Sequence, residues 1–73
     1  MKMQAVSSSN IREIGYDPES RTLEVKFQGG GRYRYHNVPL EEHERLLNRP
    51  LEGSHGRHFN QFIKPRFSSE RVA

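Results

Sequence analysis

The alternation of polar and apolar residues in two neighbouring segments constrains this chain more than any other feature. Three apolar residues alternate with polar ones in residues 21–27, and two tyrosines alternate with arginines in residues 32–36. Successive side chains of a strand point to opposite faces of a sheet, so a period of two predicts a strand in each segment. The glycine-rich residues between the segments predict that the two strands form a hairpin.

The length of the hairpin loop decides which side chains share a face. A two-residue loop would place Arg32 opposite Phe27 and would turn an arginine toward the core. A three-residue loop over residues 28–30 instead places Val25 opposite Tyr33 and keeps the apolar side chains together. The sequence therefore predicts the loop of odd length.

The rest of the chain predicts one more strand and two helices. Residues 11–16 are expected to form a strand, and Pro18 marks the turn that joins it to the hairpin. After Pro39 the period changes to that of a helix, with an inward stripe of Leu40, His43, Leu46 and Leu47. A second helix is expected to be capped by Ser54, to end before Pro65 and to carry Phe59, Phe62 and Ile63 on one side.

These elements predict an α+β fold, in which a small three-stranded antiparallel meander carries two short C-terminal helices on one face. The tail around Phe67 is expected to add a short edge strand or to fray. With 73 residues, the chain is expected to form a single domain with its core over about residues 6–67. Residues 1–5 and 68–73 are expected to be frayed.

Composition excludes several classes of protein. The chain has no cysteine, which excludes a disulfide, a thiolate metal site and a thiol nucleophile. No apolar run is longer than the pair Leu46–Leu47, so we expect no membrane span and a cytoplasmic location.

No pattern in the sequence supports a catalytic or metal site. Asp17 is the only aspartate, and no nucleophile elbow, phosphate loop or pair of catalytic carboxylates accompanies the histidines. His55 and His58 are three residues apart, but no further ligands complete a zinc site, and both are expected to lie in an exposed helical turn. We therefore expect a non-catalytic protein without a metal or a cofactor.

Five short motifs follow one another along the chain: Val6-x-Ser8-x-x-Ile11, Ile14-Gly15-Tyr16-Asp17, Leu23-x-Val25-x-Phe27-x-x-Gly30, Tyr33-x-Tyr35-x-x-Val38-Pro39 and Ser54-x-Gly56-x-x-Phe59-Asn60-x-x-Ile63-Lys64. Their order and spacing, over about residues 6–67, resemble the KTSC domain. That family is named for a segment at the C-terminus of some lysyl-tRNA synthetases, and it also occurs as small free-standing bacterial and phage proteins. The sequence departs from the expected pattern in the loop at residues 49–53. The attachment to a tRNA synthetase implies RNA binding by analogy.

The first binding candidate is the face of the sheet that carries the arginines of residues 32–36. Two interpretations exist for Tyr33 and Tyr35, which either stack on bases or point into the core. Parity favours the core, because the other arrangement would bury two arginines. The opposite face then carries Lys26, Arg32, Arg34 and His36 beside Glu24. This face is expected to be either a phosphate contact surface or a plain solvated face.

The second binding candidate lies around the second helix and the tail. Ser54 and the backbone N–H group of Gly56 are expected to form an anion site at the helix N-terminus. The cations Arg57, Lys64 and Arg66 extend this surface. Asn60 is expected to be a buried residue that ties the helix to a strand.

Two functions therefore stay open. The first is a module that binds RNA or another polyanion, which a net charge of +3 and a pI of about 9.7 favour. The second is a module that docks onto a protein partner or forms a weak homodimer through an edge strand. The acidic patch of Glu41, Glu42 and Glu44 favours the second function, because polyanions avoid it.

Overall fold

The predicted hairpin forms the centre of the fold. The computed structural model describes residues 1–72 and pairs β3 (Thr22–Phe27) with β4 (Arg32–Tyr35) in antiparallel fashion. Val25 lies opposite Tyr33, and the loop over residues 28–30 is closed by a 2.9 Å hydrogen bond from the N–H of Phe27 to the carbonyl of Gly31. The predicted loop of three residues is confirmed, because only this register turns the apolar side chains to one face.

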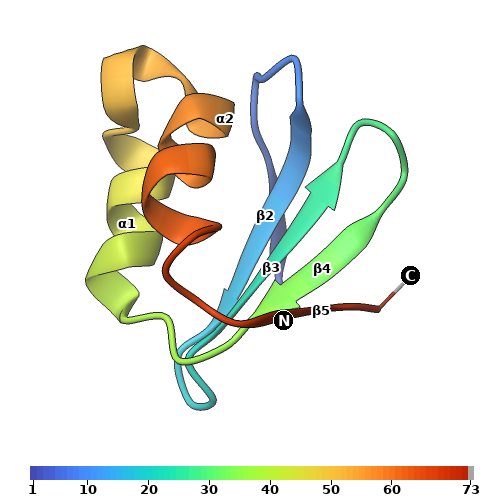
Figure 1. Ribbon diagram of the computed structural model, residues 1–73, viewed down its shortest axis with the longest axis vertical. Helices are drawn as coiled ribbons and strands as arrows, with labels where there is room; N and C mark the ends of the chain where they lie inside the picture. The colour runs from blue at the N-terminus through green and yellow to red at the C-terminus, as the bar shows by residue number, and fades with distance from the viewer. Residues whose placement is uncertain (73) are drawn as a thin grey trace.

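The sheet is larger than predicted and has five strands in the order β1-β2-β3-β4-β5 (Figure 1). Besides β2 (Ile11–Asp17), the meander gains β1 (Met3–Ala5) at one edge and β5 (Ser69–Arg71) at the other. The prediction of three strands with a frayed N-terminus was therefore wrong for residues 3–5. At the tail, the expected alternative of a short edge strand is the one that forms, at residues 69–71 rather than around Phe67, whereas Ala73 lies outside the described residues. Both outer strands are short and are held by backbone hydrogen bonds, so they leave no alternating pattern in the sequence.

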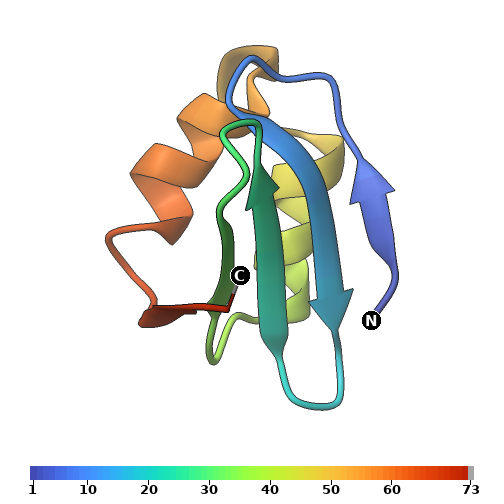
Figure 2. The same cartoon turned by 90° about the vertical axis from the view of Figure 1, so that its right-hand side faces the viewer.

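The helical segments cover one face of the sheet and leave the other open (Figures 1 and 2). They are α1 (Leu40–Asn48), the 3₁₀ turn η1 (Leu51–Gly53), α2 (His55–His58) and the π-helical turn η2 (Phe59–Ile63). The hydroxyl of Ser54 accepts a 3.1 Å hydrogen bond from the N–H of Arg57, which confirms Ser54 as the cap of α2. The predicted α+β class with helices on one face is therefore correct.

The core lies between the sheet and the helical segments. Its buried side chains come from the three inner strands, from the loop between β4 and α1 and from the helical layer: Ile11, Ile14, Leu23, Val25, Tyr35, Val38, Leu46, Phe59 and Ile63. The ring of Phe59 sits at the middle, with edge contacts to Tyr35 at 5.2 Å and to Phe27 at 5.4 Å between ring centroids. Such edge contacts stabilise aromatic clusters beyond the burial of their area.

The π-helical turn explains the main errors in the predicted helix faces. The N–H of Lys64 bonds to the carbonyl of Phe59 at 3.0 Å, five residues back, which widens the turn. Phe62 is therefore rotated away from the core face and is 36% exposed, while Phe59 and Ile63 stay buried. Asn60 is exposed rather than buried, and His58 is buried rather than exposed.

In α1 the buried line also differs from the predicted stripe. Leu40 is 52% exposed, whereas Glu42 and Leu46, which are four residues apart, are both buried. Residues four apart lie above one another on a helix, so the helix presents this line to the rest of the fold.

Candidate functional site

The open face of the sheet holds the first set of predicted cations, and its charges are largely paired. The buried carboxylate of Glu24 contacts the guanidinium of Arg34 at 2.8 Å and that of Arg32 at 3.2 Å. The hydrogen bond to Glu24 raises the pKa of Arg34 above its usual value. His36 contacts Glu70 at 3.1 Å, and Glu70 comes from the edge strand β5. A carboxylate thus lies within contact distance of each of these three side chains.

Lys26 completes this face without making it strongly basic. It lies opposite Glu13 on β2 and opposite Arg32 on β4. Since directly opposed residues share a face, the open face carries Glu13, Glu24 and Glu70 alongside its lysine and two arginines. The sheet therefore brings together Lys26, Arg32, Arg34 and His36, as predicted, but on a nearly neutral surface.

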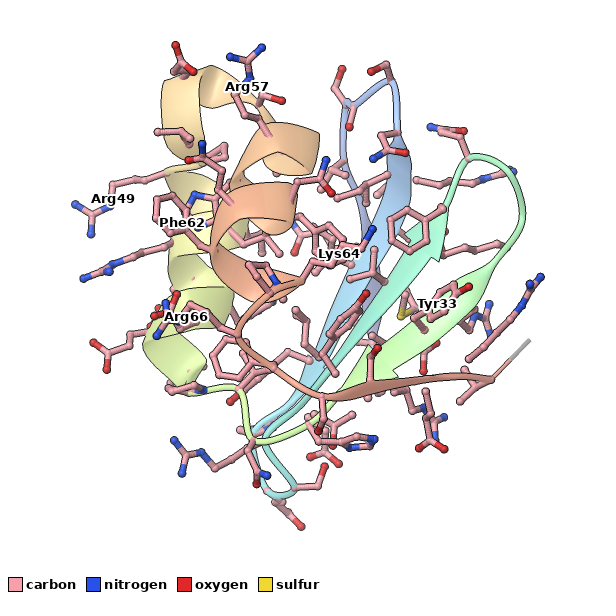
Figure 3. The ribbon with its side chains drawn as sticks, viewed as in Figure 1. Tyr33, Arg49, Arg57, Phe62, Lys64 and Arg66 are labelled. Atoms are coloured by element: carbon pink, nitrogen blue, oxygen red, sulfur yellow. The ribbon has the colours of Figure 1, made fainter. Side chains whose placement is uncertain are left out.

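The predicted anion site at Ser54 and Gly56 lies beside Arg57. Arg57 lies at one end of the helical layer, away from Arg66 (Figure 3). The Ser54 hydroxyl is engaged with the N–H of Arg57, and the guanidinium of Arg57 contacts the exposed carboxylate of Glu52 at 2.9 Å. A Cβ added to Gly56 would lie 3.4 Å from the Cβ of Asn10. The glycine thus lets the helix approach the loop before β2, which is a packing role.

Lys64 lies on a different side, over an aromatic groove between η2 and β4 (Figure 3). The groove has a volume of about 470 Å³, and Phe27, Tyr33, Tyr35 and Phe59 supply its rings. Tyr35 is buried in the core as predicted, whereas Tyr33 is half-buried and carries the guanidinium of Arg71 at 5.9 Å from its ring centroid. The groove is therefore an aromatic surface with few cations.

Three arginines gather on the outer side of the helical layer, around Phe62 (Figure 3), and two of them make no ion pair within residues 1–72. A pocket of about 340 Å³, which we call the arginine pocket, is lined by Glu42, Arg45, Arg49, Leu51, His58, Phe62 and Arg66. Its three arginines come from α1, from the residue after α1 and from the segment after η2. Chain folding thus gathers cations that are up to 21 residues apart around one exposed aromatic ring.

Only one carboxylate enters the arginine pocket. Glu42 is 8% exposed and contacts the guanidinium of Arg66 at 3.2 Å, so its negative charge is already paired within the fold. The side chains of Arg45 and Arg49 make no ion pair within residues 1–72. Glu41 and Glu44 line a separate hollow on the other side of these two arginines. The pocket therefore keeps an excess of positive charge.

His58 forms the inner wall of the arginine pocket and is only 5% exposed. Its Nδ1 accepts a 3.0 Å hydrogen bond from the N–H of Leu51, which fixes the first residue of η1. Burial lowers the pKa of His58 below its usual value, and the nearby charge of Glu42 opposes this effect only in part. The imidazole is thus held neutral, with its proton on Nε2.

Two histidines, the buried His58 and the partly buried His43, predict a loss of stability in mild acid. Burial lowers the pKa of both His58 and His43 below 6.5, their value in an unfolded chain. The unfolded state therefore binds protons first as the pH falls, and the free energy of unfolding should decrease as the pH drops through 6.5. Urea denaturation at pH 7.5 and at pH 5.5 measures this change. Equal midpoints at the two pH values would contradict it.

Sequence reasoning identified Arg66 but missed the rest of the arginine pocket. Arg45 and Arg49 lie in the segment that carries the acidic patch, so the net charge of that segment concealed them, although neither arginine makes an ion pair with these glutamates. Phe62 was assigned to the core because the π-helical turn could not be foreseen. One signal was available in the sequence. Arg45 and Arg49 are four residues apart beside a helix end, and side chains at this spacing lie on the same side of a helix.

Two other features, a metal site and a membrane-spanning helix, can be assessed over residues 1–72. No group of three or more His, Cys, Asp or Glu side chains in this part of the chain could hold a metal ion. None of the helices described is long and apolar enough to cross a membrane.

Comparison with known proteins identifies the family. The model of the KTSC domain matches residues 7–67. An uncharacterised protein of Stutzerimonas stutzeri is 51% identical over 65 residues, which cover 89% of this chain and 87% of that protein. A lysine–tRNA ligase of Nostoc punctiforme is 38% identical over 65 residues, which cover 89% of this chain but 11% of the ligase.

A solved structure gives the same result. The crystal structure of a KTSC domain protein from Yersinia pestis matches with a TM-score of 0.91 and 39% identity, covering 99% of this chain and 97% of its own. Since the family model, the relatives and this structure each span most of its length, the chain belongs to the KTSC domain family.

Proposed function

We propose that this domain is a non-catalytic module that binds single-stranded RNA through the arginine pocket. The observation that carries the proposal is the convergence of Arg45, Arg49 and Arg66 around the exposed ring of Phe62. Guanidinium groups bind phosphates, and an aromatic ring gives a flat surface on which a base can stack. Proteins that bind single-stranded RNA combine these two elements.

The arginine pocket is a better RNA site than the open face of the sheet. On the sheet, Arg32 and Arg34 share the carboxylate of Glu24, so an incoming phosphate must compete with a pair that is already formed. In the pocket, Arg66 is likewise paired with Glu42, but Arg45 and Arg49 have no such competitor within the described residues. Arg57 and Lys64 lie at other places on the surface and are expected to add only general attraction.

The relatives support a role near tRNA. The lysine–tRNA ligase that resembles this chain carries the similar segment as 11% of its length. An enzyme of that name acts on a tRNA, and a segment of such an enzyme with a cationic pocket suits contact with the RNA. We extend this role to the present chain.

Fluorescence anisotropy with a labelled tRNA or a short single-stranded RNA tests the proposal. Three phosphate contacts predict weak binding that falls with added salt, with a log–log slope of about −2 to −3. The absence of binding at high micromolar protein in low salt would contradict the proposal. Binding that salt does not change would contradict it as well, because phosphate contacts release counterions.

Docking onto another protein is the alternative function. The two outer strands, β1 and β5, end the sheet with edges of three residues each. Short edge strands discourage pairing with another chain, so we expect the domain to be a monomer. Sedimentation at several concentrations tests this expectation, and a concentration-dependent dimer would favour the alternative.

A further inference from the structure

We propose that the arginine pocket holds one unstacked nucleotide, with its base inside the pocket against His58 and its phosphate outside on the arginines. The proposal rests on the proposed RNA function and deepens it by assigning a place to the base. It starts from an observation that phosphate binding alone does not use, the unsatisfied ring nitrogen of His58.

The Nε2 of His58 is a donor without an acceptor. Because the N–H of Leu51 donates to Nδ1 at 3.0 Å, the neutral ring carries its proton on Nε2. This Nε2 is buried and has no hydrogen-bond partner among residues 1–72. A buried donor that stays unpaired costs free energy, so an acceptor atom supplied by a ligand would be bound at this position.

The pocket also presents an acceptor. Glu42 is buried in the same wall, and one of its carboxylate oxygens contacts Arg66 while the other remains as an acceptor. A nucleobase carries ring or carbonyl acceptors next to N–H donors along its pairing edge. The pair of His58 and Glu42 matches that combination, whereas a bare phosphate offers acceptors alone.

The groups that would bind the base and those that would bind the phosphate lie at different depths in the arginine pocket. His58 and Glu42 are both more than nine-tenths buried, while the side chain of Arg66 is 52% exposed and Arg45 and Arg49 lie on the surface. The donor and acceptor for a base are therefore deep, and the cations for a phosphate are at the rim. The volume of about 340 Å³ lies at the small end of ligand pockets, which suits a single nucleotide.

Phe62 is the side chain that would open the pocket. Its ring packs against the ring of His58 with centroids 4.8 Å apart and helps to cover Nε2 in the free domain. It is 36% exposed and lies within a π-helical turn, a feature that often marks functional sites. When Phe62 turns outward, its ring becomes a stacking surface for the entering base.

An NMR titration of the ¹⁵N-labelled protein tests the proposal, with AMP, CMP, GMP and UMP as probes and ribose 5-phosphate as the probe without a base. We expect shifts at Leu51, His58 and Phe62, and we expect the best nucleotide to bind about tenfold more tightly than ribose 5-phosphate. This factor corresponds to the stacking of one base.

Two variants separate the role of His58 from its role in folding. The side-chain oxygen of His58→Asn can still accept the N–H of Leu51, but the variant has no group at the position of Nε2. We expect it to keep the fold and to bind nucleotides no better than ribose 5-phosphate. Phe62→Leu changes an exposed position, so it tests the stacking surface if His58→Asn loses its fold. We expect this variant to lose the same tenfold advantage.

The outcomes distinguish this proposal from the proposed function. If the nucleotides and ribose 5-phosphate bind equally well, or if both variants keep the nucleotide preference, the base is not held in the pocket and the proposal is wrong. Salt-dependent RNA binding that needs the arginines would survive either result. If the protein binds neither RNA nor any nucleotide, both proposals are wrong.

Discussion

Reversing two charges at the rim of the arginine pocket, in Arg45→Glu/Arg49→Glu, should lower the affinity for single-stranded RNA by about 100-fold at low salt. Each substitution removes a phosphate contact and places a negative charge where the phosphate would lie. Because two contacts are lost, the log–log salt slope should become less steep by about two. Fluorescence anisotropy at several salt concentrations measures both quantities.

A matched variant controls for the change in net charge. Arg12→Glu/Arg57→Glu makes the protein more negative by the same amount, at exposed positions outside the pocket. We expect it to lower affinity only a few-fold, since it acts through the general field of the protein. If the two double variants lose affinity equally, RNA binding is not localised at the arginine pocket. Circular dichroism of both variants checks that the fold is kept.

Replacing the central aromatic ring, in Phe59→Ala, should leave the domain largely unfolded at 25 °C. Phe59 is 1% exposed and contacts both Tyr35 and Phe27 through its ring, so the substitution opens a cavity between the sheet and the helical layer. Such a change costs about 3–5 kcal/mol. A domain of this size has only a few kcal/mol of stability to lose.

The same substitution three residues later is the control. Phe62→Ala truncates an identical side chain that is 36% exposed, and it should cost less than about 1 kcal/mol. Thermal denaturation followed by circular dichroism compares the two. A cooperative transition of Phe59→Ala near that of the parent protein would show that the ring is not the centre of the core.

The hairpin shows how much of the fold could be predicted from the residues alone. Parity in residues 21–27 and 32–36 leaves one register that buries the apolar side chains, and the structure has that register. The same parity places Tyr35 in the core and Arg34 on the open face. Local capping also followed from residue types, as Ser54 shows.

The strand β1, the exact position of β5 and the helix faces could not be predicted in this way. β1 and β5 form because neighbouring backbones offer hydrogen-bonding groups, and their own three-residue sequences carry no periodic signal. The π-helical turn in η2 changes the number of residues per turn, and so it reverses the expected places of Phe62 and Asn60.

For the candidate site, the sequence predicted which residues share a face but not the charge of the resulting surface. The sequence predicted a basic surface of Lys26, Arg32, Arg34 and His36, and the fold does place them on one face. Carboxylates from other strands contact three of them there, including Glu70 of the edge strand β5. The net charge of a sequence is a sum over all its residues. The electric field at a surface depends instead on which charged groups the fold brings within a few ångströms of each other.

The sequence by itself thus determined the α+β class, the register of the central hairpin and the inward direction of its tyrosines, because burial of apolar groups on a pleated sheet allows one solution. Tertiary structure alone decided that Arg45, Arg49 and Arg66 meet around Phe62, and that His58 lies beneath them with an unpaired donor. The reason is that these residues come from segments whose mutual placement is set by the packing of α1 and η2 on the sheet, and no local pattern records that placement.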